Sequence, residues 1–360
     1  MSMGVEDAVW VNARFLQQPA TGVQRFAEQI SRELLNDHAE IVFAVPPQTT
    51  IPAWLPTANV RVVGRRSGHA WEQIDLPRAL AKAGRPILLN LASTAPIRYR
   101  NQVATHHDIT YVRYPTSFSR SFRALYRVIV PQFLKSSRAV ITVSEFSRRE
   151  IASHYGIDIS KIAVVANAAD SRFHEAQNPT PASPPYILAV SSPNEHKNFQ
   201  RLLTAYSTVE SRLTTDLVII GQQTSSFATQ QYDAGVSSRV RFTGRVSDEQ
   251  LIELYQGARG FVFPSLYEGF GIPPIEAQRC GIPVASSNAA SLPEVLGDSA
   301  LFFDPLDIDA IATSLLTIDS DPELRARLRV AGLANAERYS WSDSAAQVWL
   351  VVSQMSLTRT

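Results

Sequence analysis

The chain has 360 residues, which is long enough for about two domains of ordinary size, each with its own hydrophobic core. Its composition, 45% hydrophobic and 19% charged, is typical of a globular protein, and its single cysteine, Cys280, excludes an intrachain disulfide framework and favours a reducing compartment. The net charge of +1 combines a basic half, with 21 Lys and Arg against 14 Asp and Glu in residues 1–178, and an acidic remainder, with 13 against 19. A basic half is typical of proteins that meet an anionic surface or a phosphorylated partner, although solubility alone also accounts for it.

The chain begins without the basic segment and apolar core of a secretory signal, and no apolar run approaches the roughly 20 residues of a membrane-spanning helix. We therefore expect a cytoplasmic protein. In the first half, short apolar strands alternate with helical stretches, which predicts a doubly wound parallel sheet. The predicted strands are residues 9–11, 41–45, 60–63, 87–91, 140–143 and 162–165. After the first strand, Thr21 is a candidate N-cap of a helix that begins with Gly22 and Val23.

Two adjacent histidines, His106 and His107, follow a strand-like segment and precede Asp108. This position is the end of a strand, where open α/β sheets bind ligands. Two histidines are compatible with a metal site, but no third ligand stands at a suitable spacing, so we predict no metal.

Residues 118–133 have the period of an amphipathic helix. Its predicted faces are an apolar one, Phe118, Phe122, Leu125, Ile129 and Phe133, and a basic one, Arg120, Arg123 and Arg127. No acidic residue occurs from 109 to 144. Two interpretations remain open: the apolar face fills the domain core under a solvated arginine face, or the basic segment 113–138 contacts an anionic membrane or a lipid pyrophosphate. Pro131 is expected to kink or end the helix.

Residues 179–185 are too rich in proline for a helix or strand and are predicted to be a linker. The predicted organisation is a domain at 1–178, this linker, a second domain at 186–340 and a last helix at 341–360. In the second half the strand pattern restarts at residues 186–190, 217–220, 240–242 and 260–263, and helices are predicted at 308–316 and 322–337.

The segment 264–283 combines the end of a strand, a glycine loop and a helix. Phe270 and Gly271 belong to the loop, where bare backbone amides can approach a ligand, and a helix N-terminus behind such a loop favours anionic groups. Two carboxylates are separated by seven residues, Glu268 on the loop and Glu276 in the expected first turn of the helix. Taken alone, the pair is compatible with a solvated loop acid and an acid that complements the helix dipole, or with a site for a ribose diol and a sugar.

This segment resembles the signature of the retaining glycosyltransferases of family 4, which have the GT-B fold. The matching residues are Glu268-Gly269-Phe270-Gly271, Pro273, Glu276 and Gly281-Ile282-Pro283-Val284. Further similar segments extend the resemblance over nearly the whole chain. It implies two Rossmann-like doubly wound domains that face a cleft, a last helix that crosses back to the first domain, and closure of the domains around the substrates.

The resemblance also implies a donor site in the second domain. Glu276 would bind the ribose, Lys197 the pyrophosphate, and Glu268 the sugar, the last with the amides of Phe270 and Gly271. Ser192 and Arg245 are further candidate donor ligands. Two positions depart from the family. Many relatives have an arginine just after the strand, where this chain has Ser191 and Ser192, and many have an arginine at the position of His196. One cation for the phosphate is therefore missing or is supplied by Arg245 or His196.

On the acceptor side, the resemblance implies that His107 lies near the transferred sugar and acts in catalysis with Glu268 and Lys197. Gly22 and Val23 match the family's acceptor-side glycine loop; an ordinary strand-to-helix turn explains them equally well.

The implied reaction moves a hexose from a nucleotide-sugar to a hydroxyl of a glycan or lipid-linked glycan, without a metal or other cofactor and without nucleic acid. Because the resemblance leans to mannosyl- and rhamnosyltransferases of bacterial surface polysaccharides, GDP-mannose is the expected donor, ahead of UDP-glucose or a deoxysugar nucleotide. The expected location is cytoplasmic, with peripheral attachment to the inner face of the membrane as an option. Alternatives are a GT-B nucleotide-sugar epimerase, a non-catalytic two-lobed sugar-binding protein, and a dinucleotide oxidoreductase, which would need a G-x-G-x-x-G that the first strand lacks.

Overall fold

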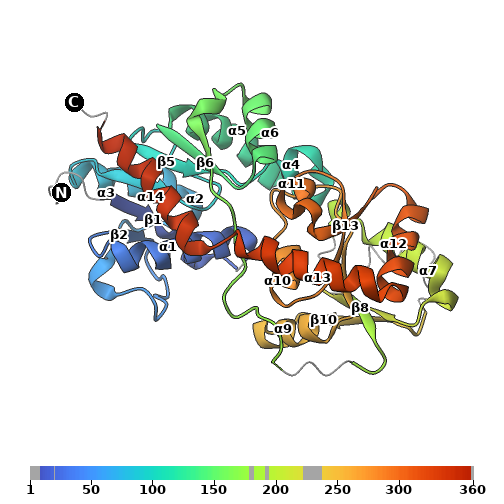
Figure 1. Cartoon of the computed structure of the whole chain (residues 1–360). Helices are drawn as coiled ribbons and strands as arrows, with labels where there is room; N and C mark the ends of the chain where they lie inside the picture. Colours follow the sequence, from blue (N-terminus) through green and yellow to red (C-terminus); the bar gives the residue numbers. More distant parts are fainter. Residues whose placement is uncertain (1–8, 20, 178–181, 191–193, 222–236, 358–360) are drawn as a thin grey trace. The chain divides into compact units, whose positions relative to one another are not determined.

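The computed structural model describes residues 9–19, 21–177, 182–190, 194–221 and 237–357 (Figure 1). The chain forms two compact units. Unit 1 contains residues 1–109, 120–167 and 341–360, and unit 2 contains residues 110–119 and 168–340. The sequence prediction ran the first domain to residue 178 without interruption, whereas residues 110–119 and 168–177 belong to unit 2. The predicted linker 179–185 lies partly outside the described residues.

In the described part of the chain, unit 1 is built on a seven-stranded parallel sheet with the order β3-β2-β1-β4-β5-β6-β7. Its strands are β1 (Val9–Asn12), β2 (Val42–Val45), β3 (Val60–Val62), β4 (Ile87–Asn90), β5 (Gln102–Thr105), β6 (Ala139–Thr142) and β7 (Ile162–Val164). Most of them are short runs of buried apolar residues, as expected for strands that are covered on both faces. The strand order reverses between β1 and β4, and the carboxyl ends of these two strands form the switch point of the sheet.

The helices of unit 1 include one short π-helical turn. They are α1 (Gly22–Asp37), α2 (Gly68–Ala70), the π-helix η4 (Trp71–Asp75), α3 (Leu76–Lys82), α5 (Arg120–Ser136), α6 (Glu145–Tyr155) and α14 (Trp341–Leu357), with the 3-10 turns η2 (Ala13–Gln17), η3 (Thr57–Asn59) and η6 (Ile159–Lys161). A π-helical turn is rare and often lies at a functional site.

The helix predicted at 118–133 is α5, with shifted bounds. It begins at Arg120, so Phe118 lies before it in extended conformation, and it continues past Pro131 to Ser136 instead of ending there. Ile129, Val130 and Phe133 are buried in unit 1, whereas Phe122 is only half-buried. The C-terminal half of the apolar face therefore fills the core, as the first interpretation predicted.

Unit 2, within the residues described, has a six-stranded parallel sheet with the order β10-β9-β8-β11-β12-β13. Its strands are β8 (Tyr186–Val190), β9 (Asp216–Ile220), β10 (Val240–Gly244), β11 (Gly260–Phe263), β12 (Val284–Ser287) and β13 (Ala300–Phe303). Its helices are α4 (Thr110–Arg113), α7 (Phe199–Val209), α9 (Asp248–Gly257), α10 (Ile272–Arg279), α11 (Leu292–Leu296), α12 (Ile308–Ser320) and α13 (Pro322–Glu337), with the 3-10 turns η5 (Pro115–Ser117), η7 (Glu195–Lys197), η8 (Glu210–Arg212) and η9 (Gly297–Ser299). The switch point of this sheet lies between β8 and β11.

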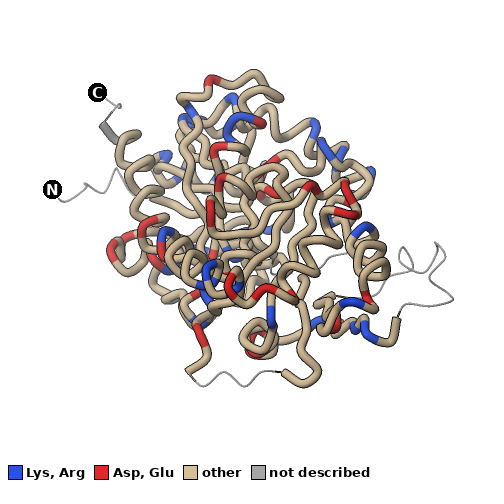
Figure 2. The backbone as a smooth tube through the Cα atoms, turned by 45° about the vertical axis from the view of Figure 1, so that its right-hand side comes forward, with Lys and Arg blue, Asp and Glu red and all other residues tan. Residues whose placement is uncertain are grey.

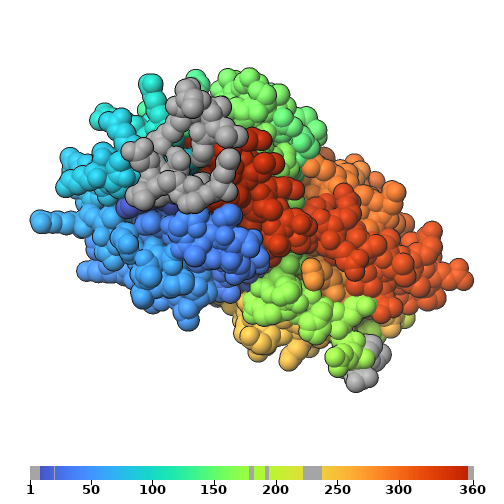
Figure 3. Space-filling view, turned by 60° about the vertical axis from the view of Figure 1, so that its left-hand side comes forward, coloured from blue at the N-terminus to red at the C-terminus, as the bar shows by residue number. Residues whose placement is uncertain are grey.

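The last helix, α14, belongs to unit 1 and packs along α1. Figure 3 shows the two in contact, α14 in red and α1 in blue. The ring of Trp349 stacks on His38 at a centroid distance of 3.6 Å, and Arg138 donates a hydrogen bond of 2.7 Å to the carbonyl of Met355. The helix is thus joined to unit 1 by apolar, aromatic and polar contacts.

Acidic and basic residues are interspersed along much of the backbone, apart from the stretch 109–144, which has no acidic residue (Figure 2). Among the helices that the structure describes, none has the length and apolar character needed to cross a lipid bilayer.

Candidate functional site

Lys197 and Glu268 meet at the switch point of the unit 2 sheet. Lys197 ends the turn that follows β8, and Glu268 lies in the loop that follows β11. The Lys197 Nζ donates to Glu268 Oε1 at 2.6 Å, and it lies 5.6 Å from the ring centroid of Phe263. Both side chains are less than a fifth exposed. A charged pair in this position can meet a ligand at the place where open α/β sheets bind one.

The hydroxyl of Ser291 holds the glycine loop after Glu268 through two backbone carbonyl groups. The Ser291 hydroxyl lies 3.0 Å from the carbonyl oxygen of Glu268 and 3.1 Å from that of Phe270. Gly271 has φ +96°, and a Cβ added there would lie 2.7 Å from Leu292 Cδ2. Only glycine therefore suits this position, because both its backbone conformation and its surroundings exclude a side chain.

Glu276 does not lie in the first turn of its helix, contrary to the sequence prediction. The helix α10 begins at Ile272, so Glu276 falls in the second turn. The first turn contains Pro273 and Pro274, which have no N–H to offer an anion. The carboxylate of Glu276 is buried, with 6% exposure, and Tyr255 donates a hydrogen bond of 3.1 Å to its Oε2.

The remaining predicted donor ligands are only partly described. Ser192 lies outside the described residues. Arg245 directly follows β10, and its side chain is exposed. His196 is buried, and its Nδ1 lies 3.2 Å from the Ser117 hydroxyl. This nitrogen of the ring therefore already has a hydrogen-bond partner within unit 2.

The segment 110–119 was missed as a neighbour of the donor-side residues. Besides the contact of Ser117 with His196, the Thr116 hydroxyl donates to Glu195, and the ring of Tyr114 lies 6.1 Å from that of Tyr267. These contacts place the segment beside η7, which ends at Lys197. The sequence carries no signal for this contact, because the segment lies far from residue 195 along the chain.

In unit 1, His107 follows β5 and is 6% exposed. Its Nε2 lies 3.3 Å from the carbonyl oxygen of Leu91, and its ring makes an edge contact with Phe26 of α1 at 4.9 Å. Burial lowers the pKa of His107 to about 4, against a smaller opposite effect of the Leu91 carbonyl. The imidazole is therefore neutral near pH 7, and because a carbonyl only accepts, its hydrogen resides on Nε2 and Nδ1 is an acceptor.

Gly22 and Val23, the predicted acceptor-side residues, open α1, the helix that contacts His107 through Phe26. Thr21 occupies the N-cap position, but its side chain caps no backbone N–H. Its hydroxyl instead donates to the Gln24 side chain. The predicted N-cap position of Thr21 is confirmed, but its side chain makes no capping hydrogen bond.

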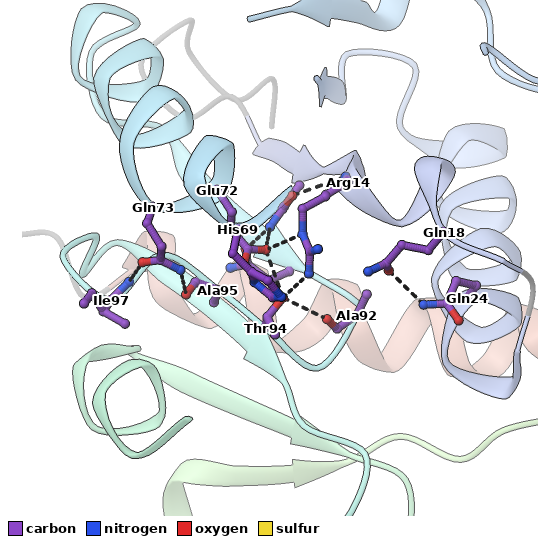
Figure 4. Close-up of polar contacts among 12 residues, drawn as sticks. Arg14, Gln18, Gln24, His69, Glu72, Gln73, Ala92, Thr94, Ala95 and Ile97 are labelled. Carbon is purple, nitrogen blue, oxygen red and sulfur yellow. Dashed lines mark hydrogen bonds and ion pairs between the residues drawn. The ribbon is translucent and has the colours of Figure 1, made fainter. Parts of the chain in front are cut away.

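A buried polar network at the unit 1 switch point was not predicted (Figure 4). Glu72 of the π-helix η4 is 1% exposed, and its Oε1 accepts hydrogen bonds from Asn12 at 2.8 Å, Thr94 at 3.0 Å and Arg14 at 3.2 Å. Arg14 also donates to the Thr94 hydroxyl at 2.6 Å. The only sequence signal was the pair of polar residues, Asn12 and Arg14, at the end of an apolar strand.

The network keeps Glu72 ionised. Burial alone would raise its pKa, but the nearby His69 ring, the charge of Arg14 and the Asn12 amide outweigh burial and hold the pKa below its ordinary value. The Nδ1 of His69 lies 3.4 Å from Glu72 Oε2. These contacts join the carboxyl ends of β1 and β4 to η4.

The two halves of the chain match two glycosyltransferase family models. Residues 20–173 match the model described as Glycosyltransferase Family 4, and residues 170–333 match the model described as Glycosyl transferases group 1. An O-antigen chain mannosyltransferase B of Escherichia coli is 34% identical over 267 residues, which cover 70% of each chain. The chain is a family 4 glycosyltransferase.

Other relatives of this glycosyltransferase agree in family and fold. The O-antigen chain mannosyltransferase RfbU of Salmonella typhimurium is 32% identical over 257 residues, which cover 69% of this chain and 70% of RfbU. Among solved structures, sucrose-phosphate synthase from Thermosynechococcus elongatus aligns with a TM-score of 0.75 and 19% identity over 97% of this chain and 99% of that one. The fold is therefore GT-B, as predicted, and the enzyme is a hexosyltransferase of polysaccharide synthesis.

The predicted site residues of this glycosyltransferase fall into the same two groups in the family matches as in the two structural units. Gly22, Val23 and His107 lie within the first match, and Lys197, Glu268 and Glu276 within the second. Among the residues that the structure describes, no three His, Cys, Asp or Glu side chains come together as metal ligands.

Proposed function

We propose that this glycosyltransferase transfers mannose from GDP-mannose to a hydroxyl group of a growing surface polysaccharide, with retention at the anomeric carbon. The names of its relatives, O-antigen chain mannosyltransferases, support mannose and a polymeric acceptor. The observation that carries the proposal is the Lys197–Glu268 pair at the switch point of the unit 2 sheet.

Each donor-side residue has a distinct proposed role. Lys197 binds the diphosphate, and its charge stabilises the negative charge that grows on the leaving oxygens in the transition state. Glu268 holds Lys197 in place and accepts hydrogen bonds from sugar hydroxyls. Glu276, oriented by Tyr255, binds the ribose diol. Because the lysine supplies the positive charge, this scheme requires no metal ion or other cofactor.

On the acceptor side, His107 has the chemistry of a neutral hydrogen-bond acceptor. Its Nε2–H is directed to the Leu91 carbonyl, so Nδ1 can accept from a sugar hydroxyl. A ring whose pKa is about 4 does not supply a positive charge at neutral pH. We therefore assign His107 to the orientation of a hydroxyl group and not to the stabilisation of the diphosphate.

The test is a steady-state assay with GDP-mannose and a mannose-terminated acceptor. Lys197→Ala should lower kcat by about 10²- to 10³-fold, the size of the loss when one preorganised stabilising group is removed. Glu276→Ala should raise the donor KM. Arg329→Ala is the matched control, because it breaks a surface ion pair of unit 2 with Glu175 and should leave both constants unchanged.

Unchanged kinetics in both site variants would refute the assignment. The anomeric configuration of the product, measured by NMR, decides between retention and inversion. Release of an epimerised donor without acceptor would instead identify an epimerase, and binding of a free sugar without a nucleotide would identify a sugar-binding protein.

We also propose that the enzyme works as a peripheral protein at the inner face of the cytoplasmic membrane. The segment 113–138 supports this location, because Arg120, Arg127 and Lys135 of α5 are exposed and Val128 beside them is 58% exposed. Exposed cations next to an apolar side chain are typical of helices that lie on anionic lipid.

A further inference from the structure

Unit 1 contains a pocket of about 520 Å³ that no predicted site residue lines. It lies between η2, the first three turns of α1 and residues 50–54, so it is formed by the segments that follow β1 and β2. Its volume falls in the range of roughly 300–1,000 Å³ that is typical of small-molecule sites. The carboxyl edge of a parallel sheet is also where such sites occur.

One wall of the pocket is aromatic. Trp54 is half-buried and makes an edge contact with Phe43 at 6.3 Å, while the guanidinium carbon of Arg32 lies 5.3 Å from the centroid of its ring. Phe15, which is 3% exposed, adds a second ring to the lining. The contacts with Arg32 and Phe43 hold the indole in place, so its position is defined before a ligand arrives.

The other wall is a polar row on one face of α1. Gln24, Glu28 and Arg32 recur every four residues, and Arg32 Nη2 lies 2.5 Å from Glu28 Oε1. Gln24 donates to the Gln18 side chain at 2.8 Å, which Figure 4 shows beside the Glu72 network. The row from Gln24 to Arg32 extends for about 12 Å along the helix.

The charges of this lining cancel. Glu28 and Arg32 are its charged residues, and they form an ion pair with each other. A phosphate or carboxylate would therefore find no uncompensated cation there. The amides of Gln18 and Gln24 both donate and accept hydrogen bonds, as the hydroxyl groups of a sugar do. Aromatic side chains beside such groups suit a ring with one apolar C–H face and a polar rim.

We propose that this pocket binds an uncharged sugar residue of the acceptor glycan, away from the hydroxyl that receives the new sugar. The proposal rests on the glycosyl transfer proposed above and adds a second contact for the acceptor. The pocket continues along α1 from Gly22 and Val23, the residues expected on the acceptor side. With such a second contact, an enzyme that extends a chain binds a long acceptor more tightly than a short one.

The test measures binding of an α-linked mannose tetrasaccharide to the full-length protein by calorimetry. Trp54→Ala should weaken the Kd about tenfold or more, as truncation of a central aromatic contact does in other interfaces. Trp349→Ala is the matched control, since this half-buried tryptophan of unit 1 stacks on His38 at the opposite end of α1. Gln24→Ala, which keeps the aromatic wall, should weaken binding about three- to tenfold by loss of hydrogen bonds.

Three results would overturn the proposal: no binding of the tetrasaccharide by the wild-type protein at millimolar concentration, equal binding by Trp54→Ala, or tighter binding of a sulfated oligosaccharide than of the neutral one. If Trp54→Ala does not fold, Gln24→Ala provides the comparison in its place. Failure of the proposed function has a different signature: no mannose transfer by the wild-type protein, with tetrasaccharide binding and its loss in Trp54→Ala intact. In the transfer assay, Trp54→Ala should raise the KM for a long acceptor and leave kcat and the KM for a short acceptor unchanged.

Discussion

The Lys197–Glu268 pair is held in a fixed geometry and is still partly exposed, as expected for groups that bind a ligand. Its 2.6 Å hydrogen bond keeps the ammonium in a defined position, and both side chains retain some exposure. A fully buried pair would require a large desolvation cost to exchange partners, whereas this pair, at 19% and 14% side-chain exposure, is still reached by solvent and can exchange at a lower cost. The lysine can therefore turn to a diphosphate without unfolding its surroundings.

Glu72 is the residue whose loss should most affect the stability of unit 1. Glu72→Ala removes the carboxylate from a network in which Arg14 remains buried, and an uncompensated buried charge costs about 3–5 kcal/mol. We expect a loss of this size in the free energy of urea unfolding. Glu145→Ala, which breaks the more exposed pair with Arg148, is the control and should cost less than about 1 kcal/mol. Equal losses would show that the network does not stabilise the fold.

The two adjacent histidines should make the protein sensitive to acid. Burial lowers the pKa of His106 to about 3, with a further lowering by His107, and burial lowers that of His107 to about 4, whereas both start from about 6.5 in the unfolded chain. Between pH 6.5 and 4 the unfolded chain thus binds more protons than the folded one. Stability is complete above pH 6.5 and falls as the pH drops through this window, by about 1.4 kcal/mol for each unit of pKa shift.

Urea unfolding from pH 7.5 to 4 measures this dependence. His106→Gln and His107→Asn should each flatten the slope below pH 6.5. The exposed His174→Gln should leave it unchanged. A wild-type stability that does not change over this range would refute the buried, neutral state of both rings.

At the scale of elements, α14 should be required for unit 1 to fold. It buries Trp341, Ala345, Val348, Val352 and Met355, and the last of these also accepts a hydrogen bond from Arg138 through its carbonyl. Removal of residues 341–360 exposes the surface that these side chains cover. If each of the four large side chains contributes about 2–5 kcal/mol, the loss is about 8–20 kcal/mol, which is as large as the 5–15 kcal/mol stability of an ordinary domain.

A point variant tests the same contact without truncation. Val348→Ala, at a fully buried position, should lower the free energy of unfolding by about 2 kcal/mol. Leu350→Ala, two residues away and 59% exposed, should change it by less than about 0.5 kcal/mol. If the protein without residues 341–360 is soluble and folded, the prediction that unit 1 needs α14 is wrong.

The proposed membrane contact also belongs to one element, α5. Arg120→Glu combined with Arg127→Glu should weaken sedimentation with phosphatidylglycerol vesicles at least about tenfold, because each basic residue near an anionic surface contributes about 1 kcal/mol. Arg327→Glu combined with Arg329→Glu on α13 makes the same change in net charge and should have little effect. If both pairs weaken binding equally, attraction depends on net charge and not on α5.

At the scale of the whole molecule, a donor nucleotide should raise the melting temperature. A ligand that binds only the folded state stabilises it by mass action, by about 2.7 kcal/mol at a concentration one hundred times its Kd. We expect GDP and GDP-mannose to raise the melting temperature more than UDP, dTDP or ADP and their sugars. The shift should be lost in Glu276→Ala and kept in Trp54→Ala. A larger shift with UDP-glucose would reassign the donor, and no shift with any nucleotide would contradict the donor site.

Much of the architecture could be predicted because buried parallel strands are short apolar runs. The runs that became β1, β8 and β11 were recognised in this way, and α13 has the predicted bounds. The same rule fails for β12, which contains Ser286 and Ser287 and is nevertheless buried. Helix boundaries also shifted where caps were ambiguous: the start of α10 at Ile272 moved Glu276 into the second turn.

The sequence by itself determined the family, the two-domain fold and the E-x7-E spacing of Glu268 and Glu276. These features depend on local patterns, namely apolar runs, glycine positions and motif spacing, that are written in consecutive residues. The tertiary structure decided the strand order, the contact of Lys197 with Glu268, the network around Glu72 and the pocket beside Trp54. Each of these joins residues that are distant in the chain, and their approach depends on how the strands order and the helices pack. A single sequence does not contain that information in any local pattern.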